Sequence, residues 1–151
     1  MEIIDIGKVD SFLEEYIYLC SLEWGKRRTK EELNDYVKKK KIKILDDERV
    51  LRILGLVSDG ILIGFVSLLV YDGCYRKDLT PWYATMYVKK EYRNKGYSKI
   101  LNDAIINEAY KLGYDKVYLK TSLVNYYEKF GAIYIEKLYN DESLYYIDLN
   151  K

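Results

Sequence analysis

The first third of the chain contains one short alternating stretch and two amphipathic segments. Residues 2–6 alternate loosely between apolar and polar side chains and stop at Gly7, which predicts a short strand. A helix should follow, with Asp10 or Ser11 as its N-cap and Gly25 at its end. Its apolar positions recur at three- and four-residue spacing: Phe12, Leu13, Tyr16, Ile17, Leu19 and Cys20.

A second, short helix is predicted after residue 28. Thr29 and Glu32 have the spacing of a capping box, and one apolar side follows. We expect this helix to end in the lysine run at 38–41. That run could hold an acidic ligand, but a solvated helix end, where positive charge suits the dipole, is the favoured interpretation.

The middle of the chain reads as three strands. Residues 50–57 and 61–71 are apolar and rich in β-branched side chains, and the turn signal at 58–60 predicts an antiparallel hairpin. After a polar loop comes Pro81, the only proline, which is tolerated at the start of a strand. Residues 82–88 should therefore form a further strand beside the hairpin.

Residues 86–98 combine the end of a strand, a glycine turn and the start of an amphipathic helix. The helix should run to Leu112, with Gly113 as its C′ residue, and a strand at 117–119 should lie parallel to the preceding strand. The turn then opens at the carboxyl end of a strand, where ligands bind in open sheets. Free amides, the helix dipole and the unhindered backbone at Gly96 predict a phosphate-bearing ligand.

The last third should contain a short helix at 122–130, closed by Gly131, and strands at 133–136 and 144–149. The element order is β-α-α-β-β-β-α-β-α-β-β. A length of 151 residues suits one α/β domain with a sizeable core.

Composition narrows the partner classes. Lys and Arg total 25 and Asp and Glu total 24, so the net charge of +1 argues against nucleic acid or an anionic membrane as main partner. The N-terminus lacks the basic and apolar regions of a signal peptide, and no run approaches the length of a membrane span. We expect a cytoplasmic protein with a small-molecule partner.

Cysteine and histidine usage narrows the chemistry. Cys20 and Cys74 lie far apart without CxxC spacing, so we interpret them as reduced thiols and expect no metal site. The chain has no histidine, which removes Ser-His and Cys-His nucleophilic pairs and histidine bases. Proton transfer is left to carboxylates, tyrosines, lysines, a thiol or water.

Two segments carry a resemblance to a known family. They are Met86-Tyr87-Val88 with Arg93-Asn94-Lys95-Gly96-Tyr97-Ser98, and Asn125-Tyr126-Tyr127-Glu128-Lys129-Phe130-Gly131. With the element order, they resemble the GCN5-related N-acetyltransferases (GNAT), which use acetyl-CoA. The resemblance implies one GNAT domain over residues 1–151, with a mixed, mostly antiparallel sheet of six to seven strands flanked by four helices.

The resemblance also implies how acetyl-CoA binds. Its pyrophosphate should lie on the backbone amides of residues 94–98, and its pantetheine along the backbone of residues 86–88. Arg93 either contacts a phosphate or holds the loop by bonding backbone carbonyls, and the second role is favoured because the backbone already supplies donors. The implied cofactor-binding residues are Met86, Tyr87, Val88, Arg93, Asn94, Lys95, Gly96, Tyr97, Ser98 and Asn125.

Acetyl transfer to an amine needs two proton transfers. The attacking amine must lose a proton, and the departing thiolate benefits from a donor. Tyr127 occupies the position of the family's tyrosine acid, with Tyr126 a weaker candidate. Glu23 is the first candidate for the base, ahead of Asp72, Asp78 and water.

Several positions depart from the family pattern. Ser98 stands where glycine or alanine is more frequent, Lys90 replaces a frequent proline, and Ala132 a usual phenylalanine. Thr121 stands where an asparagine is often found. These changes leave cofactor binding in place and leave the efficiency of the site open.

We therefore expect an acetyl-CoA-dependent N-acetyltransferase that acts on a primary amine, either of a small molecule or of a protein N-terminus or lysine. The other class is a non-catalytic acyl-CoA sensor. Nucleotide enzymes are disfavoured, since the Rossmann and P-loop glycine motifs are missing. Trp24, Trp82 and Tyr83 either wall an acceptor pocket or belong to the core. The acceptor's identity and the oligomeric state, with a homodimer among the options, stay open.

Overall fold

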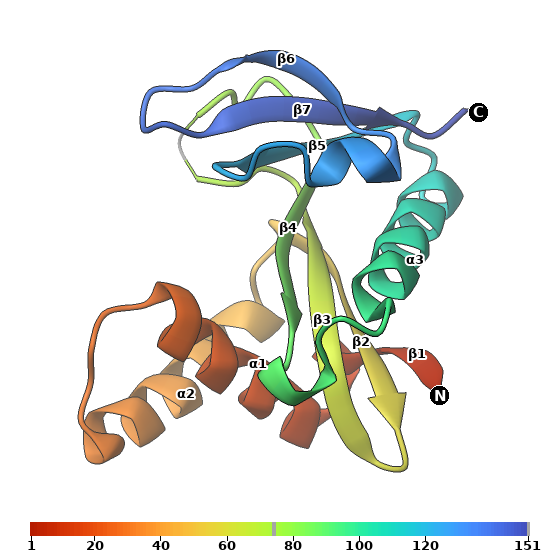
Figure 1. Ribbon diagram of the computed structural model, residues 1–151. Helices are drawn as coiled ribbons and strands as arrows, with labels where there is room; N and C mark the ends of the chain where they lie inside the picture. The colour runs from red at the N-terminus through yellow and green to blue at the C-terminus, as the bar shows by residue number, and fades with distance from the viewer. Residues whose placement is uncertain (74, 151) are drawn as a thin grey trace.

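The computed structural model describes residues 1–73 and 75–150, and a sheet of seven strands runs through the molecule (Figure 1). The strands are β1 (Glu2–Asp5), β2 (Val50–Ser58), β3 (Ile61–Leu69), β4 (Trp82–Val88), β5 (Lys116–Thr121), β6 (Ile133–Lys137) and β7 (Ser143–Asp148). Their order is β1-β2-β3-β4-β5-β7-β6, and β4 and β5 form the one parallel pair among the described strands. The predicted mixed, mostly antiparallel sheet is confirmed. Cys74, predicted to be a reduced thiol, lies outside the described residues.

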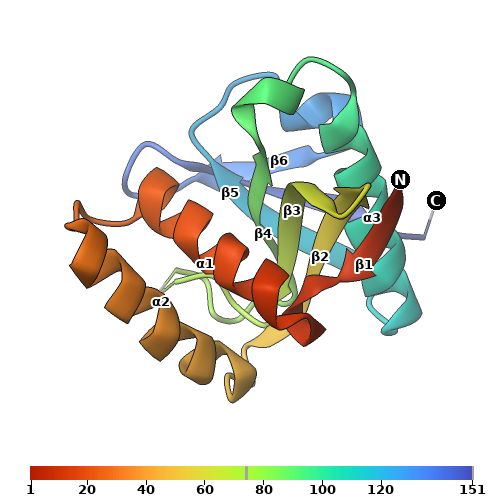
Figure 2. The same cartoon turned by 90° about the horizontal axis from the view of Figure 1, so that it is seen from below.

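Three α-helices cover the sheet in the described part of the chain: α1 (Asp10–Trp24), α2 (Lys30–Leu45) and α3 (Tyr97–Lys111). Figure 2 shows α1 and α2 on one side of the sheet and α3 on the other. Leu13 and Ile17 of α1 are buried in one cluster with Phe65 of β3. Leu101 and Ile105 of α3 belong to a second cluster on the opposite face. Each fully buried side chain of this size contributes roughly 1.5–3 kcal/mol, so both faces of the sheet hold the fold together.

The first helix starts differently from the prediction. Its N-cap is Val9, without a side-chain cap, so the expected cap at Asp10 or Ser11 is wrong. Asp10 instead lies in the first helical turn, where its carboxylate still suits the positive end of the dipole. The helix ends at Trp24 as predicted, and Gly25 N donates to Ser21 O at 3.0 Å.

The second helix confirms the capping box and extends further than predicted. Glu32 N donates to the Thr29 hydroxyl at 3.2 Å, and Thr29 N donates to the Glu32 carboxylate at 2.9 Å. The lysine run lies inside the helix rather than at its end, because Ile44 packs against the α1 side of the core. Lys41 also forms an ion pair with Glu14 of α1 at 3.3 Å.

The strand, turn and helix in the middle of the chain form as predicted. Gly96 is the N-cap of α3, and Gly113 has φ +95°, as a C′ residue needs. β4 and β5 pair only at Trp82 and Tyr118, where Tyr118 N donates to Pro81 O at 3.0 Å. Beyond that pair the strands separate, so β4 has no strand on this edge in the described structure (Figure 1).

The predicted helix at 122–130 is wrong except for its last turn, the 3-10 helix η3 (Tyr127–Phe130). Asn125 has φ +58°, which no helix accepts. Leu123 N donates to the Thr121 hydroxyl at 3.0 Å, and this local bond competes with helix formation. Val124 is 81% exposed, so packing gives the segment little support. Within residues 1–73 and 75–150, the sheet therefore has three flanking α-helices where four were predicted.

Candidate active site

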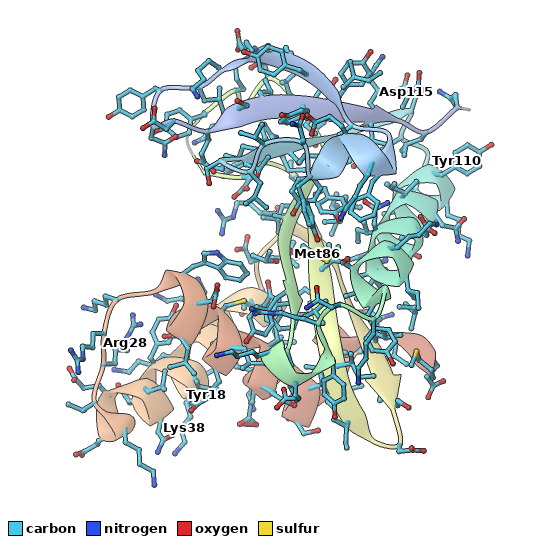
Figure 3. The ribbon with its side chains drawn as sticks, in the orientation of Figure 1. Tyr18, Arg28, Lys38, Met86, Tyr110 and Asp115 are labelled. Atoms are coloured by element: carbon cyan, nitrogen blue, oxygen red, sulfur yellow. The ribbon has the colours of Figure 1, made fainter. Side chains whose placement is uncertain are left out.

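A cleft of about 790 Å³ opens where β4 and β5 separate. Residues 84–86 of β4 and 119–121 of β5 form two of its walls. The end of α1, Tyr36 of α2, Tyr127 of η3 and the loops that contain Asp72, Ser122 and Glu142 complete the lining. Figure 3 shows Met86 on β4, between the α1–α2 end of the molecule and the part that contains β5, β6 and β7.

A β-bulge interrupts β4 on the cleft wall. Phe65 of β3 pairs with Tyr87 and Ser67 with Ala84, so two residues of β4 face one residue of β3. Thr85 lies in the bulge with φ +50°, a rare conformation for a β-branched residue. Such strain of about 1–3 kcal/mol persists only where surrounding contacts impose it.

Hydroxyl groups from three elements hold the bulge. Ser67 of β3 donates to the Ala84 carbonyl at 3.0 Å and also shares a hydrogen bond with the Thr85 hydroxyl. Tyr16 of α1 contacts the Thr85 hydroxyl at 3.3 Å. Burial raises the pKa of Tyr16, so its phenol stays neutral. Burial likewise raises the pKa of the neighbouring Cys20 thiol to about 12, so this thiol is a poor nucleophile at neutral pH.

The turn after β4 presents free backbone amides. Asn94 and Gly96 have φ +63° and +81°, and α3 follows at once. Among the described residues, the amides of 94–98 donate to no backbone carbonyl. Successive free amides at a helix N-terminus form a concave anion site. The predicted turn with free amides before a helix is thus present beyond the carboxyl end of β4.

Arg93 holds this turn against the strand. Its Nε donates to the Val88 carbonyl at 2.8 Å, and its guanidinium lies 5.4 Å from the ring centre of Tyr87. This is the second of the two predicted roles, because the side chain bonds a backbone carbonyl. The end of β4 is also tied to α1, where Lys89 pairs with Glu15 at 2.6 Å.

Tyr127 lines the cleft from η3. Its ring packs edge-on against the rings of Tyr83 and Tyr126, with ring centres 5.9 Å and 4.8 Å apart. Burial, with a smaller effect of Tyr126, raises the pKa of Tyr127 to about 12. The phenol therefore remains protonated at neutral pH and can act as a proton donor.

The candidate bases fall in different places. Glu23, near the end of α1, lines the same cleft as Tyr127 and is exposed. Asp72 also lines the cleft, and burial raises the pKa of its carboxyl group. Asp78 does not line it, because Arg76 holds its carboxylate at 3.0 Å on the surface. The structure thus brings Glu23, Asp72 and Tyr127 together and leaves Asp78 outside.

The other predicted residues divide between cleft, turn and core. Met86 lines the cleft, whereas the ring of Tyr87 stacks on Phe65 at 5.3 Å on the α1 side of the sheet. Asn125 is exposed and outside the cleft lining. Trp82 is fully buried and donates to Leu79 O at 2.8 Å, so it belongs to the core.

The remaining turn and wall residues are placed as follows. Lys95 lies with its Nζ 6.0 Å from the ring centre of Tyr92. Tyr97 and Ser98 are half-buried in the first turn of α3. Trp24 lines the cleft, and Tyr83 both lines it and is buried in the core cluster on the α3 side of the sheet, so for Tyr83 both interpretations hold.

Three functional features escape sequence reasoning. The first is Ser67, which is fully buried and holds the bulge. Its position in an otherwise apolar strand could have indicated this role, since a buried hydroxyl group needs a hydrogen-bond partner. The position of Tyr83 is among the expectations, but its buried hydroxyl, which has no partner among the described residues, is not. Glu142 enters the lining from the loop between β6 and β7, which no local pattern indicates.

None of the helices in residues 1–73 and 75–150 combines the length and apolar character that crossing a membrane requires. Within the same residues, no group of three or more potential metal ligands gathers.

Comparison with known proteins places this geometry in a family. Residues 13–132 match the model of the Acetyltransferase (GNAT) family. Comparison with curated proteins gives no sequence match. Three solved structures illustrate the similarity of fold.

The aminoglycoside 6'-N-acetyltransferase from Enterococcus faecium has a TM-score of 0.72 and 14% identity, over 100% of this chain and 98% of that one. The PaiA N-acetyltransferase from Thermoplasma acidophilum, in complex with coenzyme A, has a TM-score of 0.66 and 20% identity, over 97% of this chain and 98% of that one. An N-acetyltransferase from Staphylococcus aureus Mu50 has a TM-score of 0.65 and 18% identity, over 99% of this chain and 98% of that one. The structures establish the fold, and the family model covers well over half of the sequence. The chain belongs to the GNAT acetyltransferase family.

Proposed function

We propose that the protein transfers the acetyl group of acetyl-CoA to a primary amine of a small molecule, directly and within a ternary complex. One observation carries the proposal. A single cleft holds the half-buried phenol of Tyr127, the carboxylate of Glu23 and the bulged part of β4. After the 3-10 helix η2 (Lys90–Tyr92), the same strand is followed by the turn with the free amides of residues 94–98.

The chain offers groups that fit acetyl-CoA. The free amides of residues 94–98 suit a pyrophosphate. The left-handed conformations of Asn94 and Gly96 shape this short turn, and successive amides in such a turn form a concave anion site. Residues 86–88 would hold the pantetheine, since β4 has no neighbouring strand on that edge within the described residues. The proposed CoA-binding residues also include Lys95 in the turn and Asn125 in the loop before η3.

The residues of the cleft match the two proton transfers. Bound acetyl-CoA supplies an acetyl group activated as a thioester. Glu23 would accept a proton from the acceptor, because an alkylammonium group with a pKa of about 10.4 must become neutral before it attacks. Tyr127 would donate its phenolic proton from Oη to the departing thiolate, as the new amide bond forms and the thioester bond breaks.

The size of the cleft favours a small acceptor. Its volume of about 790 Å³ lies within the range of roughly 300–1,000 Å³ of small-molecule sites. Trp24, 54% exposed at the end of α1, offers an aromatic face beside the candidate base. A cytoplasmic enzyme acting on a soluble amine is consistent with this arrangement.

The test measures thiol release from acetyl-CoA with purified protein and a panel of polyamines, aminoglycosides, amino acids and peptides with free N-termini. We expect at least one small amine to be acetylated, with the product identified by mass spectrometry. Tyr127→Phe should lose turnover at saturating acetyl-CoA and keep its affinity for CoA. Tight CoA binding without turnover on any amine would instead indicate a sensing domain.

A further inference from the structure

Tyr83 of β4 combines deep burial with a hydroxyl group that has no hydrogen-bond partner among the described residues. It is 3% exposed and belongs to the core cluster on the α3 side of the sheet, yet it also lines the cleft. Within residues 1–73 and 75–150, two buried side-chain polar atoms lack a partner, Tyr83 Oη and Asn102 Oδ1, and Asn102 does not line the cleft. A buried hydroxyl without a partner costs stability, so its position in the cleft needs a functional explanation.

The ring of Tyr83 lies against the ring of the proposed proton donor, Tyr127. The two ring planes meet at 82°, so the contact is edge-on. Among the described residues, Tyr83 and Tyr126 are the tyrosines whose rings pack on Tyr127, and of these two only Tyr83 lines the cleft. The hydroxyl group without a partner therefore belongs to the ring that supports the donor from inside the cleft.

Tyr83 keeps its proton and has no anion to bind in the resting protein. Burial raises the pKa of its phenol well above the usual value. Negative charge on Tyr127, Tyr126 or Asp103 would raise this pKa further. Of these three groups, only the Asp103 carboxylate is ionised at neutral pH, and Lys99 holds it at 2.7 Å on the exposed side of α3.

The proposed reaction creates the acceptor that Tyr83 lacks. When Tyr127 gives its phenolic proton to the departing thiolate sulfur, the electron pair of that O–H bond stays on Tyr127 Oη as a phenolate. A phenolate accepts much stronger hydrogen bonds than a phenol, and in a partly buried site it is costly without a donor. A donor already in place where charge develops stabilises the transition state without reorganisation. Such bonds are often long in the unliganded protein and shorten in the complex.

We infer that Tyr83 is a positioning residue for the proton donor. Its hydroxyl group donates a hydrogen bond to Tyr127 Oη as the phenolate develops, and this makes Tyr127 a stronger acid towards the thiolate. Tyr83 gives up no proton itself, and Tyr127 regains its proton from water once the products have left. The inference rests on the proposed function and names a further residue for that reaction.

The first test is Tyr83→Phe, which deletes the hydroxyl group and keeps the ring. We expect kcat to fall by about tenfold, as for the loss of one hydrogen bond to a charged group, with KM for acetyl-CoA little changed. The free energy of unfolding in urea should stay the same or rise, because the lost group has no partner among the described residues. Tyr145→Phe, in the same core cluster but outside the cleft lining, is the matched control and should keep the wild-type kcat. Wild-type kcat in Tyr83→Phe would overturn the inference.

A double-mutant cycle separates this role from a general effect on the structure. Tyr127→Phe forms no phenolate, so adding Tyr83→Phe to it should cost no further kcat. The same tenfold loss in both backgrounds would show that Tyr83 does not act through Tyr127, while acetyl transfer itself would stand.

A spectroscopic measurement tests the same hydrogen bond without turnover. Replacing Tyr127 with 3-fluorotyrosine gives a fluorine NMR signal that reports the ionisation of this phenol as the pH rises. Tyr83→Phe should make the phenol at position 127 about a tenfold weaker acid, because its phenolate loses a donor, and Tyr145→Phe should leave it unchanged. If the wild-type protein acetylates no amine, the proposed function fails, and this titration still decides whether Tyr83 donates to Tyr127. An identical titration with and without the Tyr83 hydroxyl group overturns the inference, and circular dichroism at each pH confirms folding.

Discussion

The hydroxyl of Ser67 donates a hydrogen bond to the carbonyl of Ala84 at 3.0 Å, across the point where β4 bulges away from β3. Ser67 is itself fully buried, and its hydroxyl gives this carbonyl a side-chain donor next to the bulge. The neighbouring Thr85 is thereby held at φ +50°, facing the cleft. A residue of β3 that does not line the cleft thus shapes the wall on which the thioester is proposed to lie.

Replacing Ser67 should weaken both fold and activity. Ser67→Ala leaves the Ala84 carbonyl buried without a donor, which costs about 1–3 kcal/mol. It also frees Thr85 to relax from its strained conformation. We expect a lower free energy of unfolding in urea, and a kcat for acetyl transfer that falls more than the affinity for CoA.

Thr85→Gly supplies the control, because glycine adopts a positive φ without strain. In the Ser67→Ala background it should restore part of the lost kcat, so the two changes are not additive. A strictly additive loss in the double-mutant cycle would show that Ser67 does not act through the bulge.

Gly96 should be essential for the cofactor turn. It has φ +81°, and a Cβ there meets open space, so Gly96→Ala introduces strain of about 1–2 kcal/mol without a clash. Gly60 in the β2–β3 turn has φ +76° and equally open surroundings, which makes Gly60→Ala a matched control. Both should lose similar stability, but only Gly96→Ala should weaken CoA binding measured by calorimetry. Equal CoA affinities in the two variants would remove this turn from the proposed binding site.

Tyr127→Phe isolates the proton donor. The change deletes one hydroxyl and keeps the ring that packs against Tyr83 and Tyr126. We expect kcat to fall by about 100-fold or more, with little change in the CoA dissociation constant. Tyr139→Phe, at an 85% exposed position, should behave as wild type. A Tyr127→Phe protein that keeps full turnover rules out this acid.

Local sequence signals predicted the parts of the fold that depend on neighbouring residues. Thr29 and Glu32 form their capping box, and Gly113 ends α3, because each signal acts within one helical turn. The hairpin of β2 and β3 follows from two apolar runs and the turn between them. The free amides after Gly96 follow from a glycine turn before a helix.

The bulge and the cleft could not be predicted in this way. The bulge depends on Ser67 and Tyr16, which reach Thr85 from 18 and 69 residues away, and residues 82–88 alone read as a regular strand. The segment at 122–130 has helical spacing, but a local bond from Leu123 N to the Thr121 hydroxyl competes with the helix. Glu142 enters the cleft through the pairing of β6 with β7, which is a tertiary relationship.

Glu23→Gln tests the proposed base. The amide keeps the shape of the side chain and cannot accept a proton from the acceptor, so kcat should fall by about 100-fold at neutral pH. Raising the pH supplies more neutral amine and should recover part of this loss. Glu31→Gln, at an exposed position in the first turn of α2, is the control. If Glu23→Gln keeps the wild-type kcat, Glu23 is not the base, and Asp72 or water must accept the proton instead.

Alkaline pH should destabilise the protein through Tyr127 and Cys20, two half-buried groups whose pKa values are raised. Burial raises the pKa of Tyr127 and of Cys20 to about 12, while the unfolded chain has values of about 10 and 8.5 for these groups. Because the unfolded state releases these protons first, the stabilising contribution is complete below about pH 8 and is lost as the pH rises towards 12. Urea unfolding between pH 8 and 11 should show a steady fall in the free energy of unfolding. Tyr127→Phe should reduce the slope above pH 10, whereas Tyr139→Phe at its exposed site should not, and equal slopes in the two variants would contradict the effect of burial on Tyr127.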